Sequence, residues 1–114
     1  MIQVEQISKH YGELKALSEV SFSMQKGEIV GLLGVNGAGK STLMKILSGI
    51  IRPDKGTVSF FGNDFTVDSL KIKKQIGYLS EDNPLYDDMY VREYLEYVRG
   101  IYKSDKRRVT EAIE

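Results

Sequence analysis

The sequence of 114 residues contains no cysteine, so it can form neither a disulfide nor a thiolate metal site. It also lacks an excess of either charge, because 16 basic residues balance 16 acidic ones. A dedicated nucleic-acid-binding protein normally has a marked basic excess for phosphate contacts, so this balance argues against nucleic acid as a partner. The content of 41% hydrophobic and 28% charged residues is typical of a soluble globular protein.

Long apolar runs are missing as well. No stretch approaches the roughly 20 apolar residues of a membrane-spanning helix, and residues 1–5 lack the basic start and apolar segment of a secretory signal. Internal repeats and low-complexity tracts are absent too. We therefore expect one domain or part of one, whose contact with a membrane would require a partner.

The apolar residues change repeatedly between a period of two and a period of about 3.6, which predicts a mixed α/β fold. A first strand is expected at Ile2 and Val4, with a slip in register before Ile7. The remaining expected strands are a half-buried one over 20–24, a peripheral one over 57–61, and two apolar ones buried on both faces over 28–33 and 76–79.

Helical spacing of apolar residues begins at Ser41 and continues in a stripe to Ile50. Further helices are expected over 70–75, from Val91 to a possible cap or interruption at Gly100, and from residues 104–105 to the end of the sequence. The last amphipathic helix stops after two or three turns, which is the pattern of a truncated domain. We expect residues 1–114 to be the N-terminal part of one domain.

The strongest motif is a glycine-rich run that fits the phosphate-loop pattern G-x-x-x-x-G-K-[ST], also called Walker A. It consists of Gly34, Val35, Asn36, Gly37, Ala38, Gly39, Lys40, Ser41 and Thr42. Glycines let backbone N–H groups approach a polyphosphate, and the start of the following helix adds positive potential. Lys40 would neutralise the outer phosphates, the Ser41 hydroxyl would bind Mg²⁺, and Thr42 would reach another phosphate oxygen.

The expected strand, loop and helix occur in the order that this motif requires. That order disfavours an incidental lysine in a glycine-rich turn, and the missing G-x-G-x-x-G spacing disfavours a dinucleotide site. The run over 35–43 resembles the phosphate loop of the nucleotide-binding subunits of ATP-binding cassette (ABC) transporters. The resemblance extends over the segments 8–12, 16–22, 53–58 and 76–79. Within that family, residues 76–95 look most like gliding-motility-associated ATPases.

The resemblance implies an α/β phosphate-loop core with an antiparallel β-subdomain, and it gives Tyr11 the role of stacking on adenine. An aromatic ring offers a π-face to a purine at modest entropic cost. Glu81 stands where the family usually has a glutamine that touches Mg²⁺ and senses the γ-phosphate. It is either such a ligand or a solvated loop carboxylate. The single histidine, His10, is expected to be a solvated turn residue because no carboxylate lies beside it in the sequence.

The family also implies a function, namely ATP hydrolysis with Mg²⁺, coupled to transport by integral membrane permease subunits at the inner face of the cell membrane. The segment after Glu81, including Asp87, Asp88 and Tyr90, would contact those subunits. Hydrolysis needs a head-to-tail homodimer, and the signature loop, Walker B strand and switch histidine are absent from these 114 residues. We therefore expect this chain to bind ATP without turning it over. Alternatives are a soluble ABC ATPase that is not a transporter and a non-enzymatic nucleotide-binding regulator.

Overall fold

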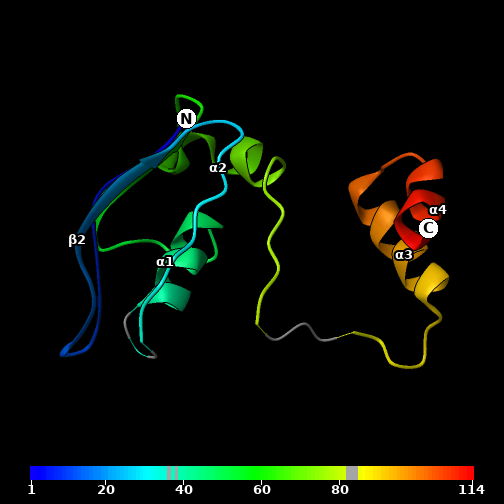
Figure 1. The fold of residues 1–114 in the computed structure, drawn as a ribbon, viewed down its shortest axis with the longest axis horizontal. Coiled ribbons are helices and arrows are strands. Elements are labelled where there is room, and N and C mark those ends of the chain that lie inside the picture. Colours follow the sequence, from blue (N-terminus) through cyan, green and yellow to red (C-terminus); the bar gives the residue numbers. More distant parts are fainter. Residues whose placement is uncertain (36, 38, 82–84) are drawn as a thin grey trace. The chain divides into compact units, whose positions relative to one another are not determined.

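The computed structural model describes residues 1–35, 37, 39–81 and 85–114. Over these residues the chain forms, in order, β1 (Ile2–Tyr11), β2 (Leu14–Met24), α1 (Lys40–Leu47), β3 (Lys55–Phe60), β4 (Asn63–Asp64), α2 (Phe65–Lys73), α3 (Val91–Tyr102) and α4 (Arg107–Ile113) (Figure 1). The chain divides into two compact units, Met1–Tyr78 and Leu79–Glu114.

The first unit is built on a four-stranded sheet with the strand order β2-β1-β3-β4. Each pairing in this sheet is antiparallel. β1 is central, and its Val4 lies opposite Phe22 of β2 on one side and opposite Val58 of β3 on the other. The predicted antiparallel β-subdomain is therefore confirmed, as is the mixed α/β fold class.

The slip predicted before Ile7 is a β-bulge in β1, followed by a compensating bulge in β2. Gln6 and Glu19 stand at these bulges with φ of 48° and 50°. Their N–H groups bond to serines of the opposite strand: Gln6 N donates to Ser21 Oγ at 2.8 Å, and Glu19 N donates to Ser8 Oγ at 3.0 Å. The two hydroxyls thus replace ladder bonds that the bulges interrupt.

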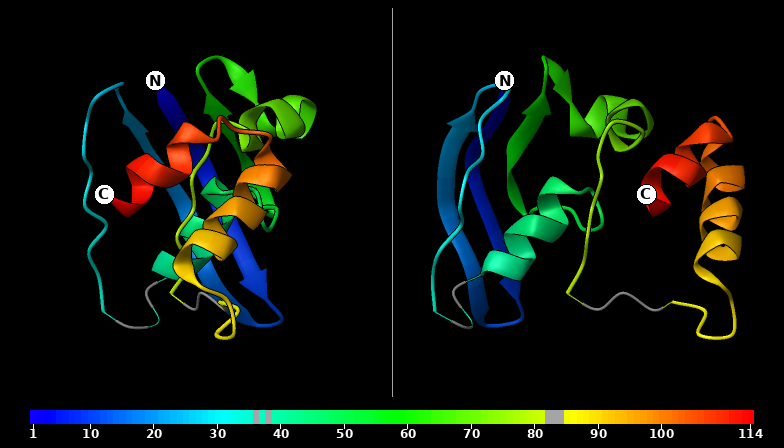
Figure 2. Two further views of the ribbon diagram at one scale, coloured as in Figure 1. Left: turned by 90° about the vertical axis from the view of Figure 1, so that its right-hand side faces the viewer. Right: turned by 45° about the vertical axis from the view of Figure 1, so that its right-hand side comes forward.

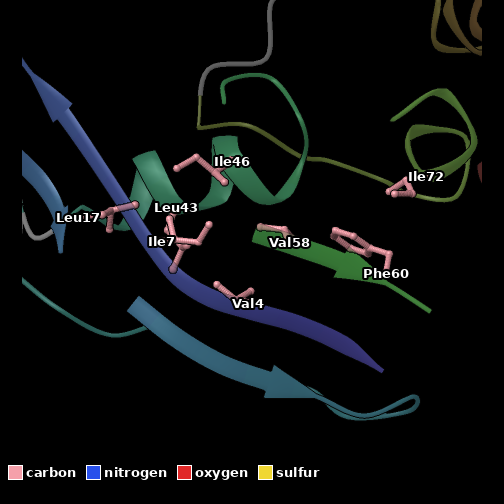
Figure 3. Packing of buried hydrophobic residues seen from close by; sticks show 8 residues of the cluster. All are labelled: Val4, Ile7, Leu17, Leu43, Ile46, Val58, Phe60 and Ile72. Carbon is pink, nitrogen blue, oxygen red and sulfur yellow. The ribbon is translucent and has the colours of Figure 1, made fainter. Parts of the chain in front are cut away.

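The hydrophobic core lies between this sheet and the helices α1 and α2, which lie on the same side of it (Figure 2). Figure 3 shows its buried members, which are Val4, Ile7, Leu17, Leu43, Ile46, Val58, Phe60 and Ile72. The bulge in β1 lets Val4 and Ile7 share this core although three positions separate them.

The predicted apolar stripe of the first helix is only partly correct, because α1 ends at Leu47. Gly49 follows with φ of 74°, and the Phe65 ring lies where its side chain would stand, with Cε1 2.5 Å from an ideal Cβ. The chain turns at this point, which leaves Ile50 57% exposed.

Two predicted strands, 28–33 and 76–79, are wrong as elements of this structure. Both segments are unpaired within the part of the chain that the structure describes. Ile29 and Leu33 are 102% and 94% exposed, whereas the apolar run predicted burial on both faces. A strand requires hydrogen-bonded neighbours, and no described strand pairs with either segment. Residues 76–78 instead line an apolar cavity of about 370 Å³ beside α1.

Several element boundaries also differ from the prediction. β2 covers Leu14–Met24 instead of 20–24. β3 covers 55–60 instead of 57–61, since Phe61 has φ of 50° and leaves the strand. α2 begins at Phe65 instead of Leu70, because the Asp64 carboxylate caps the helix by accepting the Thr66 N–H at 2.7 Å. The helix is kinked at Asp68, which has non-helical dihedral angles.

The second unit contains α3 and α4. Helix α3 passes through Gly100 and ends at Tyr102, with Lys103 as its C-cap at φ of 51°, so the glycine neither caps nor interrupts the helix. The last helix starts at Arg107 instead of residues 104–105, with Asp105 accepting the Arg107 N–H at 2.9 Å. The tyrosines near α3 pack on one another, with ring centroids of Tyr86 and Tyr97 6.0 Å apart. No helix in the described part of the chain has the length and apolar character to cross a membrane.

The buried hydroxyl of Ser8 gives a stability prediction. Ser8→Ala leaves the Glu19 N–H without its partner at the bulge and should lower the free energy of unfolding by about 1–3 kcal/mol. Urea unfolding followed by circular dichroism measures the change. Ser18→Ala, on the exposed side of β2, is the control and should have little effect. Equal stabilities of the two variants would refute the role of the hydroxyl.

Candidate nucleotide-binding site

The end of the glycine-rich loop is fixed against β2. Gly39 has φ of 88°, and a Cβ built on it would stand 2.4 Å from the Ala16 carbonyl oxygen and 2.8 Å from Leu17 Cδ2. Only glycine fits such a conformation and such a close approach. The backbone of β2 therefore determines where α1 begins.

The first turn of α1 has backbone donors that the helix itself leaves unpaired. Its first internal hydrogen bond runs from Leu43 N to Gly39 O at 2.9 Å, so the N–H groups of residues 40–42 have no partner inside the helix. The first turn has no acidic residue, and no side chain caps it. With the positive end of the helix dipole, this arrangement suits an anion.

Lys40 is held within the loop. Its ammonium group donates a hydrogen bond to the carbonyl oxygen of Gly34 at the start of the motif. That bond places a positive charge between the two ends of the loop. A bound phosphate would accept a hydrogen bond from the same ammonium group, in exchange for the bond to the carbonyl.

Tyr11 and the phosphate loop line one cavity of about 250 Å³. Its lining residues are Tyr11, Leu14, Ala16, Gly37, Gly39, Lys40, Ser41 and Thr42. The cavity thus combines an aromatic ring that is 48% exposed with amide donors, an ammonium group and two hydroxyls. These groups fit a nucleotide, which has a flat base and a polyphosphate.

Sequence reasoning missed Leu14 and Ala16 as lining residues. Both belong to β2, directly after the hairpin turn that follows Tyr11, and alternate residues of a strand share a face. That period of two could have identified them. Gly34 and Val35 are exposed and do not line the cavity, and Asn36 and Ala38 lie outside the described residues.

The two residues predicted to bind metal lie in different units. Ser41 lines the cavity of the first unit, and Glu81 is an exposed residue of the second. Within the described residues no cluster of three histidine or carboxylate side chains could hold a metal ion. Mg²⁺ at a nucleotide typically has one or two protein ligands, with phosphate oxygens and water completing its octahedron. The Ser41 hydroxyl fits such a ligand set.

His10 is not a turn residue, and it does have a carboxylate beside it. It belongs to β1, and its N–H donates to Asp54 Oδ2 at 2.7 Å, while its Nδ1 lies 3.5 Å from the same oxygen. The His10 N–H, followed by the ammonium group of Lys9, holds the pKa of the Asp54 carboxyl below its ordinary value. This contact could not be predicted from local pattern, because 44 positions separate the two residues.

The close approach of Gly39 to β2 gives a second prediction. Gly39→Ala should lower the free energy of unfolding by about 2–4 kcal/mol. The new methyl group would clash with the Ala16 carbonyl, and alanine also has an energetic cost at positive φ. Gly37→Ala is the matched control. Gly37 has φ of 84° but open space around its Cβ position, so about 1–2 kcal/mol is expected. If urea unfolding shows the same loss of free energy of unfolding in Gly39→Ala and Gly37→Ala, the contact between Gly39 and β2 contributes nothing to the difference.

Comparison with known proteins identifies the family. The ABC transporter family model matches residues 17–114. The chain is 37% identical over 113 residues to the sulfate/thiosulfate import ATP-binding protein CysA of Bacillus cereus, covering 99% of this chain and 31% of that protein. It is 39% identical over 97 residues to the phosphonates import ATP-binding protein PhnC of Fusobacterium nucleatum, covering 82% of this chain and 39% of that protein.

Solved structures agree with these relatives. The ATP-binding subunit of an ABC transporter superimposes with a TM-score of 0.79 at 30% identity, covering 94% of this chain and 45% of that one. The dimeric ABC transporter cassette MJ0796 gives a TM-score of 0.81 at 25% identity, covering 99% of this chain and 54% of that one. The chain thus spans about a third to a half of the proteins it matches. It belongs to the ABC transporter family.

Proposed function

We propose that this chain forms the N-terminal part of the nucleotide-binding domain of an ABC transporter ATP-binding subunit, from the phosphate loop to the segment of Glu81. The observation that carries this proposal is the single cavity lined by Tyr11, Lys40 and Ser41. In this cavity the aromatic ring at the end of β1 lies with the first turn of α1, which begins 29 positions later in the sequence. A base and a polyphosphate require these two kinds of surface side by side.

The nucleotide would be ATP with Mg²⁺. In this proposal the phosphates accept hydrogen bonds from the backbone amides of the loop residues that line the cavity, Gly37 and residues 39–42, and from the side chains of Lys40 and Thr42. The Ser41 hydroxyl binds Mg²⁺, and the Tyr11 ring stacks on adenine. The names of CysA and PhnC describe them as ATP-binding proteins, which supports ATP as the ligand. The gliding-motility subfamily stays a prediction, since the relatives named above carry other names.

In the full-length protein we propose ATP hydrolysis that drives transport through membrane permease subunits. The import functions in the names of CysA and PhnC support a transport role, and the dimeric cassette MJ0796 supports pairing of two nucleotide-binding domains. The permease would hold the ATPase at the inner face of the membrane. The exposed Asp87, Asp88 and Tyr90 would contribute to that contact.

Nucleotide binding by this chain tests the proposal directly. Isothermal calorimetry should detect MgATP binding, and Lys40→Ala should weaken it about 10- to 100-fold, because charge-assisted hydrogen bonds to phosphate are lost. Lys45→Ala, an exposed lysine in the last turn of the same helix, is the matched control. Circular dichroism verifies that each variant is folded. A folded chain that binds MgATP equally well with and without Lys40 would contradict the proposal.

The role proposed for Glu81 as a Mg²⁺ ligand or γ-phosphate sensor is tested by Glu81→Gln in the full-length protein. Glutamine removes a negative charge near the phosphates and adds a hydrogen-bond donor, so the Mg²⁺ concentration that gives half-maximal ATP turnover should shift. Glu111→Gln, at an exposed position of α4, should leave this concentration unchanged. If turnover and its Mg²⁺ dependence are the same in Glu81→Gln and the wild type, Glu81 is a solvated loop carboxylate.

A further inference from the structure

Asp54 connects the turn before β3 to the end of β1. Its carboxylate accepts the His10 N–H at 2.7 Å and lies 3.4 Å from the Lys9 ammonium group. Its own N–H donates to the Ser8 carbonyl oxygen at 2.9 Å. One residue therefore contacts three consecutive residues of β1, directly before Tyr11.

These bonds replace pairing that the sheet does not supply. β1 pairs with β3 only as far as Ser8, which lies opposite Lys55. Beyond that point β1 pairs with β2 alone, through Tyr11 and Leu14 at the hairpin end. The Asp54 carboxylate occupies the open side of this strand end and takes the N–H that a ladder partner would have bonded.

Lys9 extends the connection to the Tyr11 ring. Its ammonium group stands over that ring, 5.7 Å from the centroid, within the range of a cation–π interaction. The Lys9 side chain is only 18% exposed, so its contacts with Asp54 and with the ring restrict it. With the cation over one face, the other face of the ring is the one available for stacking.

We propose that Asp54 is a positioning residue for base recognition, which holds Lys9 and the end of β1 so that Tyr11 presents one fixed face to the base of the nucleotide. This inference rests on the proposed function, because it takes the cavity to bind ATP. It assigns Asp54 to the base and not to the phosphates. The carboxylate is charged at neutral pH, as an aspartate ordinarily is, and the His10 N–H lowers its pKa further.

The test separates the base from the phosphates by comparing two ligands. Affinities of this chain for MgATP and for magnesium tripolyphosphate, which has phosphates and no base, are measured by calorimetry. Tyr11→Ala should weaken MgATP binding about 5- to 100-fold by removing the stacking surface. Asp54→Asn should weaken it by a smaller factor, about 3- to 10-fold, because the ring loses its fixed orientation. Tripolyphosphate binding should change less than about 2-fold in both.

Asp64→Asn is the matched control. Asp64 also accepts a backbone N–H at 2.7 Å, from Thr66, and its pKa is lowered in the same direction, chiefly by the Thr66 hydroxyl. It caps α2 and does not line the cavity. Its substitution should alter stability without changing the ratio of the two affinities. Combining Asp54→Asn with Tyr11→Ala should add nothing to Tyr11→Ala alone, because Asp54 acts through the ring.

Lys9→Met provides a second approach if Asp54→Asn unfolds the chain. Methionine keeps an apolar stem and removes the cation, and it leaves the bond between His10 and Asp54 in place. The same selective loss of MgATP affinity is expected. The inference would be overturned if these variants weakened the binding of MgATP and of tripolyphosphate equally, or if their effect on MgATP affinity added fully to that of Tyr11→Ala. The proposed phosphate site would stand in either case. A wild-type chain that binds neither ligand would overturn the proposed function and this inference together.

Discussion

The first unit depends on the pairing of β1 with a strand on each side. The pairing of β1 with β2 positions the β2 backbone that packs against Gly39. The pairing of β1 with β3 brings Asp54, which directly precedes β3, to the C-terminal end of β1. This arrangement requires backbone strain at the bulges, where two residues other than glycine adopt positive φ. Ser8 and Ser21 make the strain tolerable by bonding the two N–H groups that leave the ladder. The geometry of the cavity follows from a small number of strand contacts.

The fold could be predicted where local pattern and tertiary structure agree. The slip before Ile7 was visible because Val4 and Ile7 could share a core only if a residue was added, and the bulge confirms it. The apolar runs 28–33 and 76–79 misled the prediction for the opposite reason. The apolar composition of these two runs indicates burial, but a strand also needs a hydrogen-bonded neighbour. The described residues contain no strand that pairs with either run. Composition alone cannot supply that information.

The site divides in the same way. The glycines, Lys40 and Ser41 could be identified because the chemistry of a phosphate loop lies in consecutive residues, and Tyr11 could be identified from the family resemblance. Leu14 and Ala16 required knowledge of where the hairpin turns, and Asp54 required knowledge of which turn meets the end of β1. Contacts between residues far apart in sequence leave no local pattern, so a single sequence cannot reveal them.

The unpaired segment 28–33 has a practical consequence for the isolated chain. It carries β-branched and leucine side chains, has a single charge and no proline, and its Ile29 and Leu33 are almost fully solvent-accessible. A segment of this kind is a template for pairing with the same segment of another molecule. The isolated chain should therefore self-associate as its concentration rises, and its solubility should depend on covering this segment more than on its balanced surface charge.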